Sequence, residues 1–245
     1  MSTDPAEVRF VDLDATEKSA DLLAQFYGAL YTAEFPDPNE RESLANMVGY
    51  LAHDGAFGNA YLVTIMLAGE RIVGGSVADY FVRSNCGAIE FLVVERSRRR
   101  RGFGARLTRH TEERIASAAA ARARSVQFVM AEINDPLKRS ATPDNVDPFE
   151  RVQFWAKLHY RRASFPYVQP PLSDQQAAVT NLLLGVRPIE APDAAAMPAA
   201  TIEAFLRDYL IYAMRIDVPE DTPEFAAMKR YLDDHATISL VALDP

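Results

Sequence analysis

The fold is decided by one stretch of sequence, Arg99-Arg100-Arg101-Gly102-Phe103-Gly104. An apolar run at 89–94, typical of a β-strand, precedes it, and the segment 103–121 that follows has apolar residues at helical spacing. The order is therefore strand, glycine-containing loop and helix. Backbone N–H groups at the start of a helix lack intrahelical partners and carry partial positive charge, and glycine lets a ligand approach the main chain closely. The stretch predicts a binding site for a phosphate or pyrophosphate group.

The composition is that of a globular protein. Hydrophobic residues make up 49% of the 245 residues, enough for a sizeable core. The formal net charge of −8 disfavours nucleic acid as a partner, and no apolar run is long enough to cross a bilayer. Cys86 is the single cysteine, which excludes an intrachain disulfide, and residues 1–7 are too polar for a secretory signal. We expect a cytoplasmic protein that binds neither nucleic acid nor a membrane.

Apolar periodicity predicts a mixed sheet with helices on both faces. We expect strands at 8–13, 61–67, 71–83, 88–94, 126–132, 165–168, 179–186 and 237–243. We expect helices at 16–30, 40–51, 103–121, 149–158 and 199–214, and another that starts at Thr222-Pro223. One helix separates the strands 88–94 and 126–132, which predicts that these two are parallel neighbours. The hairpin connections of the others predict antiparallel pairing.

The character of the chain changes after residue 187. Residues 188–198 are rich in proline and alanine and predict a linker or a surface wrap. Two helices and a terminal strand follow. We therefore divide the chain into a main domain, 1–187, and a C-terminal helical extension, 188–245, that packs on this domain or on a partner subunit.

The loop and its surroundings resemble the GNAT superfamily of acetyl-CoA-dependent N-acetyltransferases. The family's loop signature is Arg or Gln, two residues, Gly, one residue, then Gly or Ala. The residues that carry the resemblance are Arg99, Gly102 and Gly104 in the loop, Leu92, Val93 and Val94 at the end of the preceding strand, and the aromatic helix 154–160. The resemblance covers about residues 8–186. It implies an α/β (α+β) fold with a mixed, mostly antiparallel sheet, splayed parallel central strands and helices on both faces.

The resemblance implies that acetyl-CoA binds between the splayed strands. Backbone groups of Leu92 and Val94 would pair with the pantetheine arm as an added strand does, and Asn134 would contact the same arm or be a plain loop residue. The pyrophosphate would be held by main-chain N–H groups of Arg99, Arg100, Arg101, Gly102, Phe103, Gly104 and Ala105. The Arg99 side chain would touch phosphate or fix the loop, and the neighbouring arginines would be solvated or meet the 3′-phosphate. A localisation signal or a nucleic-acid patch explains this arginine cluster less well, because a strand and a helix flank it directly.

Acetyl transfer to an amine needs a base, because an alkyl amine is mostly protonated at neutral pH. Glu90 is the candidate, since it interrupts an apolar strand; the alternative is a cross-strand partner for Arg83. The resemblance implies that the N–H of Val94 stabilises the oxyanion. Where relatives carry a tyrosine acid, this chain has Trp155. His159 lies four residues further on, on the same face of the predicted helix, and is either a substitute acid or a surface residue.

The resemblance places the acceptor site at the loops 34–39 and 134–148. Their acidic residues are Glu34, Asp37 and Glu40, and Asp135, Asp144 and Asp147. An acidic rim suits a cationic amine, although solvated loop charges give the same pattern. The histidines lack the spacing of metal ligands, so we expect no metal.

These features predict an N-acetyltransferase. It would move the acetyl group of acetyl-CoA, its co-substrate, to a primary amine of a small molecule or peptide, by direct attack in a ternary complex. The alternatives are a catalytically silent, acyl-CoA-binding sensor and a protein-interaction module. The extension 188–245 would be a lid over the acceptor site or a homodimer contact.

Overall fold

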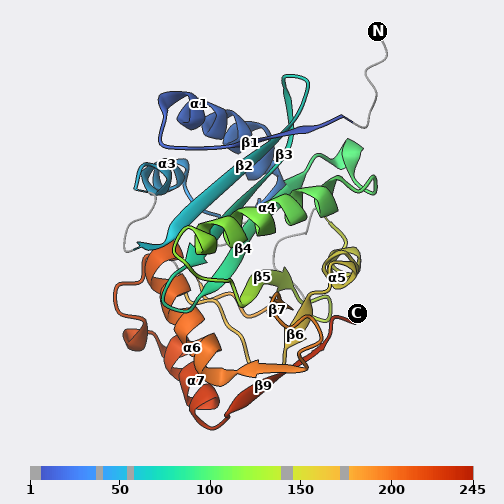
Figure 1. Cartoon of the computed structure of the whole chain (residues 1–245). Helices are drawn as coiled ribbons and strands as arrows, with labels where there is room; N and C mark the ends of the chain where they lie inside the picture. The colour runs from blue at the N-terminus through green and yellow to red at the C-terminus, as the bar shows by residue number, and fades with distance from the viewer. Residues whose placement is uncertain (1–6, 37–40, 54–57, 139–145, 172–176, 245) are drawn as a thin grey trace. The chain divides into compact units, whose positions relative to one another are not determined.

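The computed structural model describes residues 7–36, 41–53, 58–138, 146–171 and 177–244. The chain falls into two compact units (Figure 1). The first unit is Met1–Asp79 with Ile89–Ala118, and the second is Tyr80–Ala88 with Ala119–Pro245. Three elements run from one unit into the other: β3 (Arg71–Phe81), β4 (Cys86–Val94) and α4 (Phe103–Ala120). Within the described residues, no helix is both long enough and apolar enough to cross a membrane.

The strands of the first unit follow the order β1, β2, β3, β4. β1 (Arg9–Asp12) pairs antiparallel with β2 (Ala60–Ala68), and Arg9 lies opposite Leu67. β2 and β3 are joined by a tight turn in which Gly69 has a φ of +60°, a conformation that glycine adopts without strain. The predicted hairpin is therefore confirmed.

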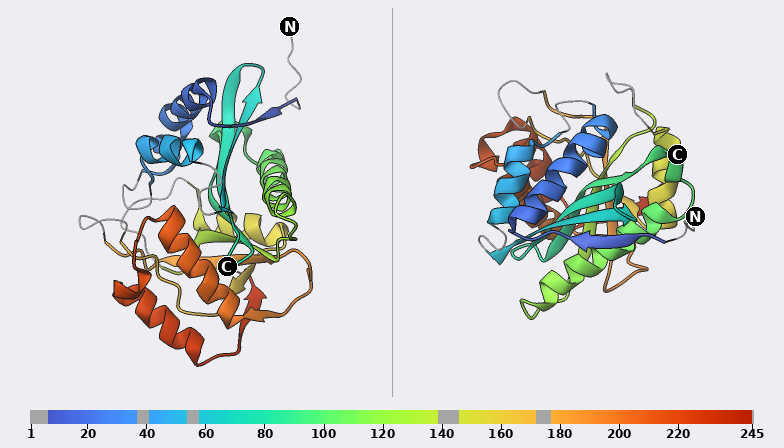
Figure 2. Two further views of the ribbon diagram at one scale, coloured as in Figure 1. Left: turned by 60° about the vertical axis from the view of Figure 1, so that its left-hand side comes forward. Right: turned by 90° about the horizontal axis from the view of Figure 1, so that it is seen from above.

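Helices cover both faces of the first unit's strands. Figure 2 shows α1 (Glu17–Phe26) and α3 (Leu44–Ala52) on one side of β2 and β3 and α4 on the other. Val63 and Ile65 of β2 pack with Leu23 and Phe26 of α1, as the alternation of a strand requires. Caps start the two helices, because the side chains of Thr16 and Ser43 accept main-chain N–H groups. The predicted helix at 16–30 continues through a π-helical segment, Tyr27–Tyr31, into α2 (Thr32–Glu34).

The strands of the second unit follow the order β4, β5, β7, β6, β9, β8. Their bounds are β5 (Phe128–Asn134), β6 (Arg161–Ala163), β7 (Leu182–Pro188), β8 (Ala196–Pro198) and β9 (Thr237–Ala242). β5 runs parallel to β4, and the pairs beyond it are antiparallel. The fold class is therefore confirmed as a mixed, mostly antiparallel sheet. The splay of β4 from β5 stays a prediction.

Three helices belong to the second unit: α5 (Pro148–Lys157), α6 (Ala199–Asp208) and α7 (Pro223–Asp233). A π-helical segment, Tyr209–Ala213, continues α6, and Thr222 caps α7 as predicted. α6 and α7 share one core with β5 and β7, because Phe205 and Phe225 pack in the same cluster as Met130 and Leu184. The segment 188–245 therefore packs on residues of 119–187 inside one compact unit. A domain boundary at residue 188 stays a prediction.

The strand predicted at 165–168 is wrong. The N–H of Phe165 donates to the carbonyl of Ala163 at 3.0 Å, and that of Tyr167 to the carbonyl of Phe165 at 2.9 Å. These are two successive three-residue turns, and Pro166 between them has no N–H to give to a strand. The strand that pairs with β7 lies just upstream, at β6, and the supposed linker contains β8.

Candidate functional site

The loop between β4 and α4 has the geometry that its sequence suggests. After Val94 the chain makes a single 3₁₀ turn, Arg96–Arg98, and α4 begins at Phe103. Gly102 has a φ of +80°, a backbone conformation that residues with a side chain rarely adopt. Space is not the reason for glycine here, because a Cβ at this position would meet nothing within 4 Å. Arg100 has a φ of +61°, a strained value for a residue with a side chain. The glycine is therefore required by the turn of the backbone.

The start of α4 presents unpaired backbone donors. Helical pairing begins with the N–H of Arg106, which donates to the carbonyl of Gly102 at 3.0 Å. Within the described part of the chain, the N–H groups of Gly102, Phe103, Gly104 and Ala105 donate to no protein acceptor. Gly102 is exposed, and Gly104 and Ala105 are half-buried, so these donors lie at the surface. A helix start of this kind binds anions.

Arg99 holds the loop in place. Its Nε donates to the carbonyl of Val94 at 2.9 Å, and its Nη2 donates to Oε2 of Glu34 at 2.5 Å. Its own N–H donates to the carbonyl of Arg96 at 3.3 Å. The Arg99 N–H therefore has a protein acceptor, and its part in binding the pyrophosphate stays a prediction. The side chain fixes the loop, and its contact with phosphate stays a prediction as well. Glu34 also pairs with Arg96 at 3.5 Å.

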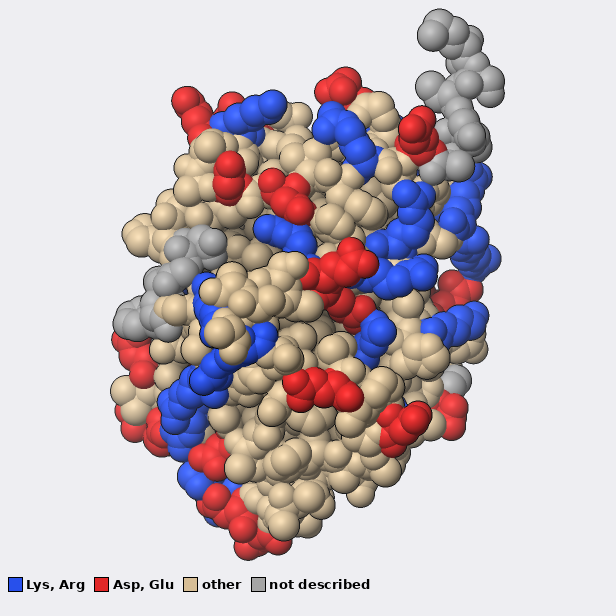
Figure 3. All heavy atoms as spheres, in the orientation of Figure 1, with Lys and Arg blue, Asp and Glu red and all other residues tan. Residues whose placement is uncertain are grey.

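Two of the other arginines lie near Phe103. Arg100 and Arg101 are exposed, whereas Phe103 is buried in a small core cluster with Val8, Met66 and Val73. The guanidinium of Arg98 lies 6.0 Å from the Phe103 ring centroid and that of Arg106 lies 5.8 Å from it. Figure 3 shows Lys and Arg side chains gathered where Figure 1 draws the connection from β4 to α4. Positive charge therefore surrounds the donors at the start of α4.

Glu90 lies in an aromatic part of the first unit. It is half-buried in β4, three residues from Val93, which packs in the core, and one from Phe91, whose ring is 4.9 Å from that of Tyr31. Burial, and after it the charge of Glu90, raises the pKa of Tyr61; burial likewise raises that of Tyr31, with a smaller effect of Glu90. The charge of Glu90 therefore acts on two tyrosines of the core that α1 covers.

The π-helical segment Tyr27–Tyr31 joins this region to α3. Tyr31 accepts the N–H of Glu42 at 2.8 Å, and Tyr27 donates its hydroxyl to the carbonyl of Glu42 at 3.2 Å. The carboxylate of Glu42 in turn accepts the hydroxyl of Tyr50 at 3.3 Å. π-helical turns are rare and are often found at functional sites. The aromatic residues around Glu90 are therefore fixed by hydrogen bonds as well as by packing.

A second glutamate, Glu132 of β5, was missed by the sequence analysis. Tyr167 donates its hydroxyl to Oε1 of Glu132, and Tyr209 donates to Oε2 at 3.0 Å. Tyr209 comes from the π-helical segment after α6, so the C-terminal segment reaches a strand of the sheet. The sequence does contain a feature that could have singled out Glu132: like Glu90, it is a charged residue within an otherwise apolar strand.

Asn134 is the last residue of β5, and its side chain is engaged. Arg151 of α5 donates to Oδ1 of Asn134. This contact orients the amide at the end of the strand, so that its Nδ2 is the group left to a ligand. Contact of Asn134 with the pantetheine arm stays a prediction.

His159 does not lie on a helix face with Trp155. α5 ends at Lys157, and His159 follows with a φ of +65° in an exposed turn. The expected helical spacing is therefore wrong, because the chain leaves the helix before residue 159. Trp155 is 6% exposed and packs against Tyr160, with ring centroids 4.7 Å apart. The role of His159 as a substitute acid stays a prediction.

The three acids of the expected rim that the structure describes all bind groups of the protein itself. Glu34 binds Arg99, and Asp147 is the N-cap of α5, accepting the N–H of Phe149 at 2.8 Å. Asp135 accepts the N–H of Leu137 at 3.0 Å. The other three members, Asp37, Glu40 and Asp144, lie outside the described residues. No cluster of three or more His, Cys, Asp or Glu able to hold a metal occurs among the residues that the structure describes.

Comparison with known proteins identifies the class. Residues 21–140, which include β4, the loop, α4 and β5, match the acetyltransferase (GNAT) family. A GNAT-family protein from Bacteroides thetaiotaomicron has a similar structure, with a TM-score of 0.60 and 16% identity over 85% of this chain and 99% of that one. A GNAT-family protein from Desulfovibrio desulfuricans has a TM-score of 0.50 and 13% identity over 74% of this chain and 99% of that one. A tandem GNAT protein from the clavulanic acid biosynthesis pathway has a TM-score of 0.50 and 23% identity over 66% of this chain and 46% of that one.

Residues 21–140 therefore match the GNAT acetyltransferase family, and the fold of the chain is that of GNAT-family acetyltransferases. At these identities the solved structures define the fold alone. A comparison with curated protein sequences gives no match.

Proposed function

We propose that the protein transfers the acetyl group of acetyl-CoA to an amine. The observation that carries this proposal is the set of N–H groups from Gly102 to Ala105, which have no protein acceptor within the described residues and lie in the segment that matches the GNAT family. A diphosphate satisfies such donors, and the surrounding arginines add favourable charge. Acetyl-CoA supplies both the diphosphate and a reactive thioester.

The chain's own groups have separate tasks in this proposal. The amides at the start of α4 bind the diphosphate, and the bond from Arg99 to the carbonyl of Val94 fixes the end of β4 relative to that loop. Leu92 and Val94 would then offer backbone groups to the pantetheine arm, and the N–H of Val94 would stabilise the oxyanion. In the second unit, Asn134 is proposed as a further contact for this arm.

Glu90 is proposed as the base. It accepts a proton from the attacking amine, directly or through water, so that the nitrogen lone pair can form the new bond to the carbonyl carbon as the C–S bond breaks. The half-buried position of Glu90 among aromatic side chains supports this role. The thiolate of CoA is a good enough leaving group to depart without a dedicated acid, which fits the exposed position of His159.

The test combines binding with turnover. Acetyl-CoA is titrated by calorimetry, and thiol release is followed with a panel of amines. Gly104→Val places a branched side chain beside the α4 amides, so acetyl-CoA affinity should fall at least about tenfold, in line with the loss of charge-assisted bonds. Gly49→Ala in α3 is the matched control, since a Cβ there meets nothing within 4 Å.

The outcomes separate the alternatives. Binding with thiol release supports the enzyme. Binding without release for any amine indicates a silent acyl-CoA sensor. Absence of binding, or an affinity that Gly104→Val leaves unchanged, contradicts the proposal.

A further inference from the structure

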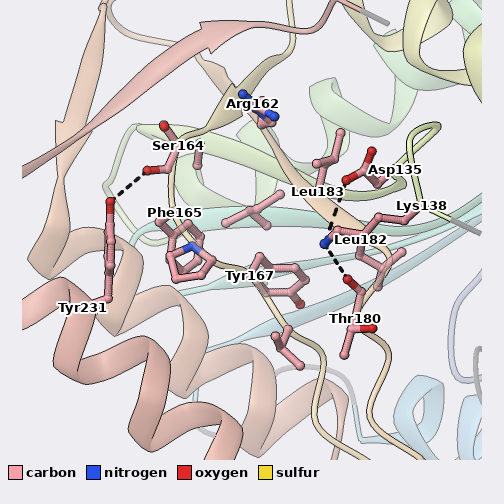
Figure 4. A pocket seen from close by; sticks show the side chains of 14 residues that line it. Asp135, Lys138, Arg162, Ser164, Phe165, Tyr167, Thr180, Leu182, Leu183 and Tyr231 are labelled. Carbon is pink, nitrogen blue, oxygen red and sulfur yellow. Dashed lines mark hydrogen bonds and ion pairs between the residues drawn. The ribbon is translucent and has the colours of Figure 1, made fainter.

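The second unit contains a cavity of about 520 Å³, and every described residue that lines it belongs to that unit. Its walls come from β7, from the segment after β6, from the turn after β5 and from α7 (Figure 4). They are polar as well as apolar, since Ser164, Thr180 and Tyr231 carry hydroxyls and Phe165 and Leu182 are apolar. The volume lies in the range of pockets that hold small ligands. Such walls suit a small ligand that has both polar and apolar parts.

The cavity lies where β6 separates from β7. The two strands pair at Arg161 and Arg162 of β6. After Ala163 the chain makes its two tight turns, and the two segments next pair where Gln169 faces Val179. Between these two points, β7 has β5 on one side and the cavity on the other, with no second strand paired to it among the described residues.

The main chain of Leu182 presents a donor and an acceptor on this open side. The carbonyl of Asn181, just before it, accepts the N–H of Asp135 at 2.8 Å, and such bonds alternate between the two sides of an antiparallel strand. The N–H and carbonyl of Leu182 therefore point away from β5, toward the cavity. They form no hydrogen bond within the described part of the chain, although Leu182 is 6% exposed. Buried main-chain groups are nearly always paired, so these two indicate a bound partner.

The charged side chains that line the cavity, as far as the chain is described, have a net charge of one positive unit. The guanidinium of Arg162 forms no ion pair or hydrogen bond with the described residues. Lys138 donates to the carbonyl of Thr180 at 2.7 Å, and its Nζ lies 3.9 Å from Oδ2 of Asp135. Asp135 therefore offsets Lys138, and one negative charge on a ligand balances Arg162. A carboxylate fits this role, because it pairs with the planar guanidinium through two parallel bonds.

Arg162 and Leu182 are spaced for one residue of a peptide. Arg162 lies opposite Gly185, three residues along β7 from Leu182, and three residues of a strand span about 10 Å. An extended acylated amino acid covers part of this distance, and the long side chain of Arg162 covers the rest. The N–H and carbonyl of an exposed strand residue pair with the carbonyl and N–H of an added peptide. The ligand therefore carries an amide and, beside it, a carboxylate.

We propose that this cavity binds an acylated amino acid that has a free carboxylate, either as a separate molecule or as the C-terminal residue of a peptide. The ligand's amide pairs with the main chain of Leu182, and its carboxylate pairs with Arg162. Its side chain lies against the apolar part of the walls, which includes Phe165. An acylated amino acid has no α-amine to acetylate, so this site is an addition to the proposed acetyl transfer and does not rest on it.

Three matched probes test the binding by calorimetry on the full-length protein. They are N-acetyl-leucine, N-acetyl-leucinamide, which lacks the carboxylate, and O-acetyl-leucic acid, in which an ester oxygen replaces the amide N–H. N-acetyl-leucine should bind at least about tenfold more tightly than the amide and about threefold more tightly than the ester. Arg162→Gln should abolish the first difference and keep the second. Arg230→Gln, which removes an exposed arginine of α7 that does not line the cavity, is the control.

Nuclear magnetic resonance locates the site. The main-chain amide signal of Leu182 should shift when N-acetyl-leucine is added, and that of Gly49 in the first unit should not. The longer peptide acetyl-Ala-Ala-Leu distinguishes the two sources: equal affinity indicates the C-terminus of a peptide, and loss of binding indicates a separate small molecule.

Three results would overturn the proposal: equal binding of the three probes, a preference for the carboxylate that survives Arg162→Gln, or an unmoved Leu182 signal. If none of the probes binds, water alone satisfies these groups and the proposal is wrong.

Discussion

Glu90 in the first unit and Glu132 in the second interrupt otherwise apolar strands, and each lies near two tyrosines. The hydroxyls of Tyr167 and Tyr209 donate directly to the two oxygens of Glu132. In the first unit, Tyr31 accepts the N–H of Glu42, and the charge of Glu90 acts on it through space. The same residue type in the same kind of strand therefore has two different surroundings.

The difference separates two uses of a carboxylate. Hydroxyl donors on both oxygens orient Glu132 and join β5 to the C-terminal segment, which is a structural task. Glu90 lies on the strand that leads into the loop proposed to bind the diphosphate, and the proposed acetyl transfer needs a proton acceptor. In the proposed function, Glu90 of the first unit transfers a proton and Glu132 of the second cross-links two segments, and four changes test this hypothesis.

Glu90→Gln has the largest expected effect. If Glu90 is the base, turnover should fall by about 10²–10⁴-fold, while the dissociation constant of acetyl-CoA changes less than about threefold. Thiol release and calorimetry on the same preparation measure both. Glu132→Gln is the matched variant in the other unit and should lower the free energy of unfolding more than it lowers kcat. A Glu90→Gln variant with wild-type turnover would remove the distinction between the two glutamates.

Glu34→Gln tests how far the first unit depends on its charged contacts. Arg99 and Glu34 are 26% and 11% exposed in their side chains, so the variant leaves a partly buried guanidinium without its carboxylate. We expect a loss of about 2 kcal/mol in the free energy of unfolding, and weaker acetyl-CoA binding because the loop loses its support.

The control is Arg9→Gln, which breaks an ion pair with Glu70 whose side chains are 54% and 94% exposed. That change should cost less than about 0.5 kcal/mol in urea unfolding. Equal costs for the two variants would show that the loop does not depend on the buried pair.

Tyr209→Phe removes one of the two hydroxyls from Glu132. The free energy of unfolding should fall by about 1–2 kcal/mol, because a half-buried oxygen loses its donor. Tyr167→Phe and the double variant complete a cycle, and the two effects should not add, since both hydroxyls serve one carboxylate. Tyr231→Phe, which removes an exposed bond, is the control. A Tyr209→Phe variant with greatly reduced turnover and unchanged stability would show that Glu132 takes part in catalysis.

Asp208→Asn has the smallest effect and the clearest pH dependence. Asp208 is fully buried and accepts the N–H of Ser84 at 2.8 Å; burial raises its pKa. The carboxyl is neutral in both folded and unfolded chains at low pH, and as pH rises above about 4 the unfolded chain ionises first, which costs the folded state stability.

The asparagine keeps an acceptor for the Ser84 N–H and does not ionise. Its stability relative to the natural protein should therefore increase between pH 4 and pH 8, by about 1.4 kcal/mol for each unit by which the pKa of Asp208 is raised. Urea unfolding at several pH values measures this. If the free energies of unfolding of the two proteins changed in parallel with pH, ionisation of the buried Asp208 would not destabilise the folded state.

The features that could be read from the sequence are those set by local pattern. The start of α4 at Phe103 and its end near residue 120 follow from apolar periodicity after a glycine loop, and Thr222 caps α7 because the cap and proline are adjacent in sequence. The glycine at 102 was expected to let a ligand approach the main chain, whereas the structure shows that its left-handed φ of +80° favours glycine as well.

Contacts between segments that are distant in the chain could not be predicted from the sequence. The pairing of Glu34 with Arg99 joins residues 65 positions apart. The sequence therefore suggested that Glu34 is a solvent-exposed charge at the acceptor site. His159 was misplaced because nothing in its own sequence marks the end of α5. The apolar stretch at 165–168 resembles a strand, and only the structure shows that its side chains line a cavity and pack on a core.

The π-helical segment Tyr27–Tyr31 has a consequence for the evolution of this domain. A π turn holds one residue more than an α turn, so the extra residue is absorbed within one turn and the residues on either side of it keep their faces. Deletion of a single residue there would restore ordinary winding without turning α1 away from the strands, and would change only the side chains of the segment itself, such as Tyr31, which accepts the N–H of Glu42. One amino acid gained or lost at this point therefore alters the aromatic residues of this core while the packing of α1 is kept.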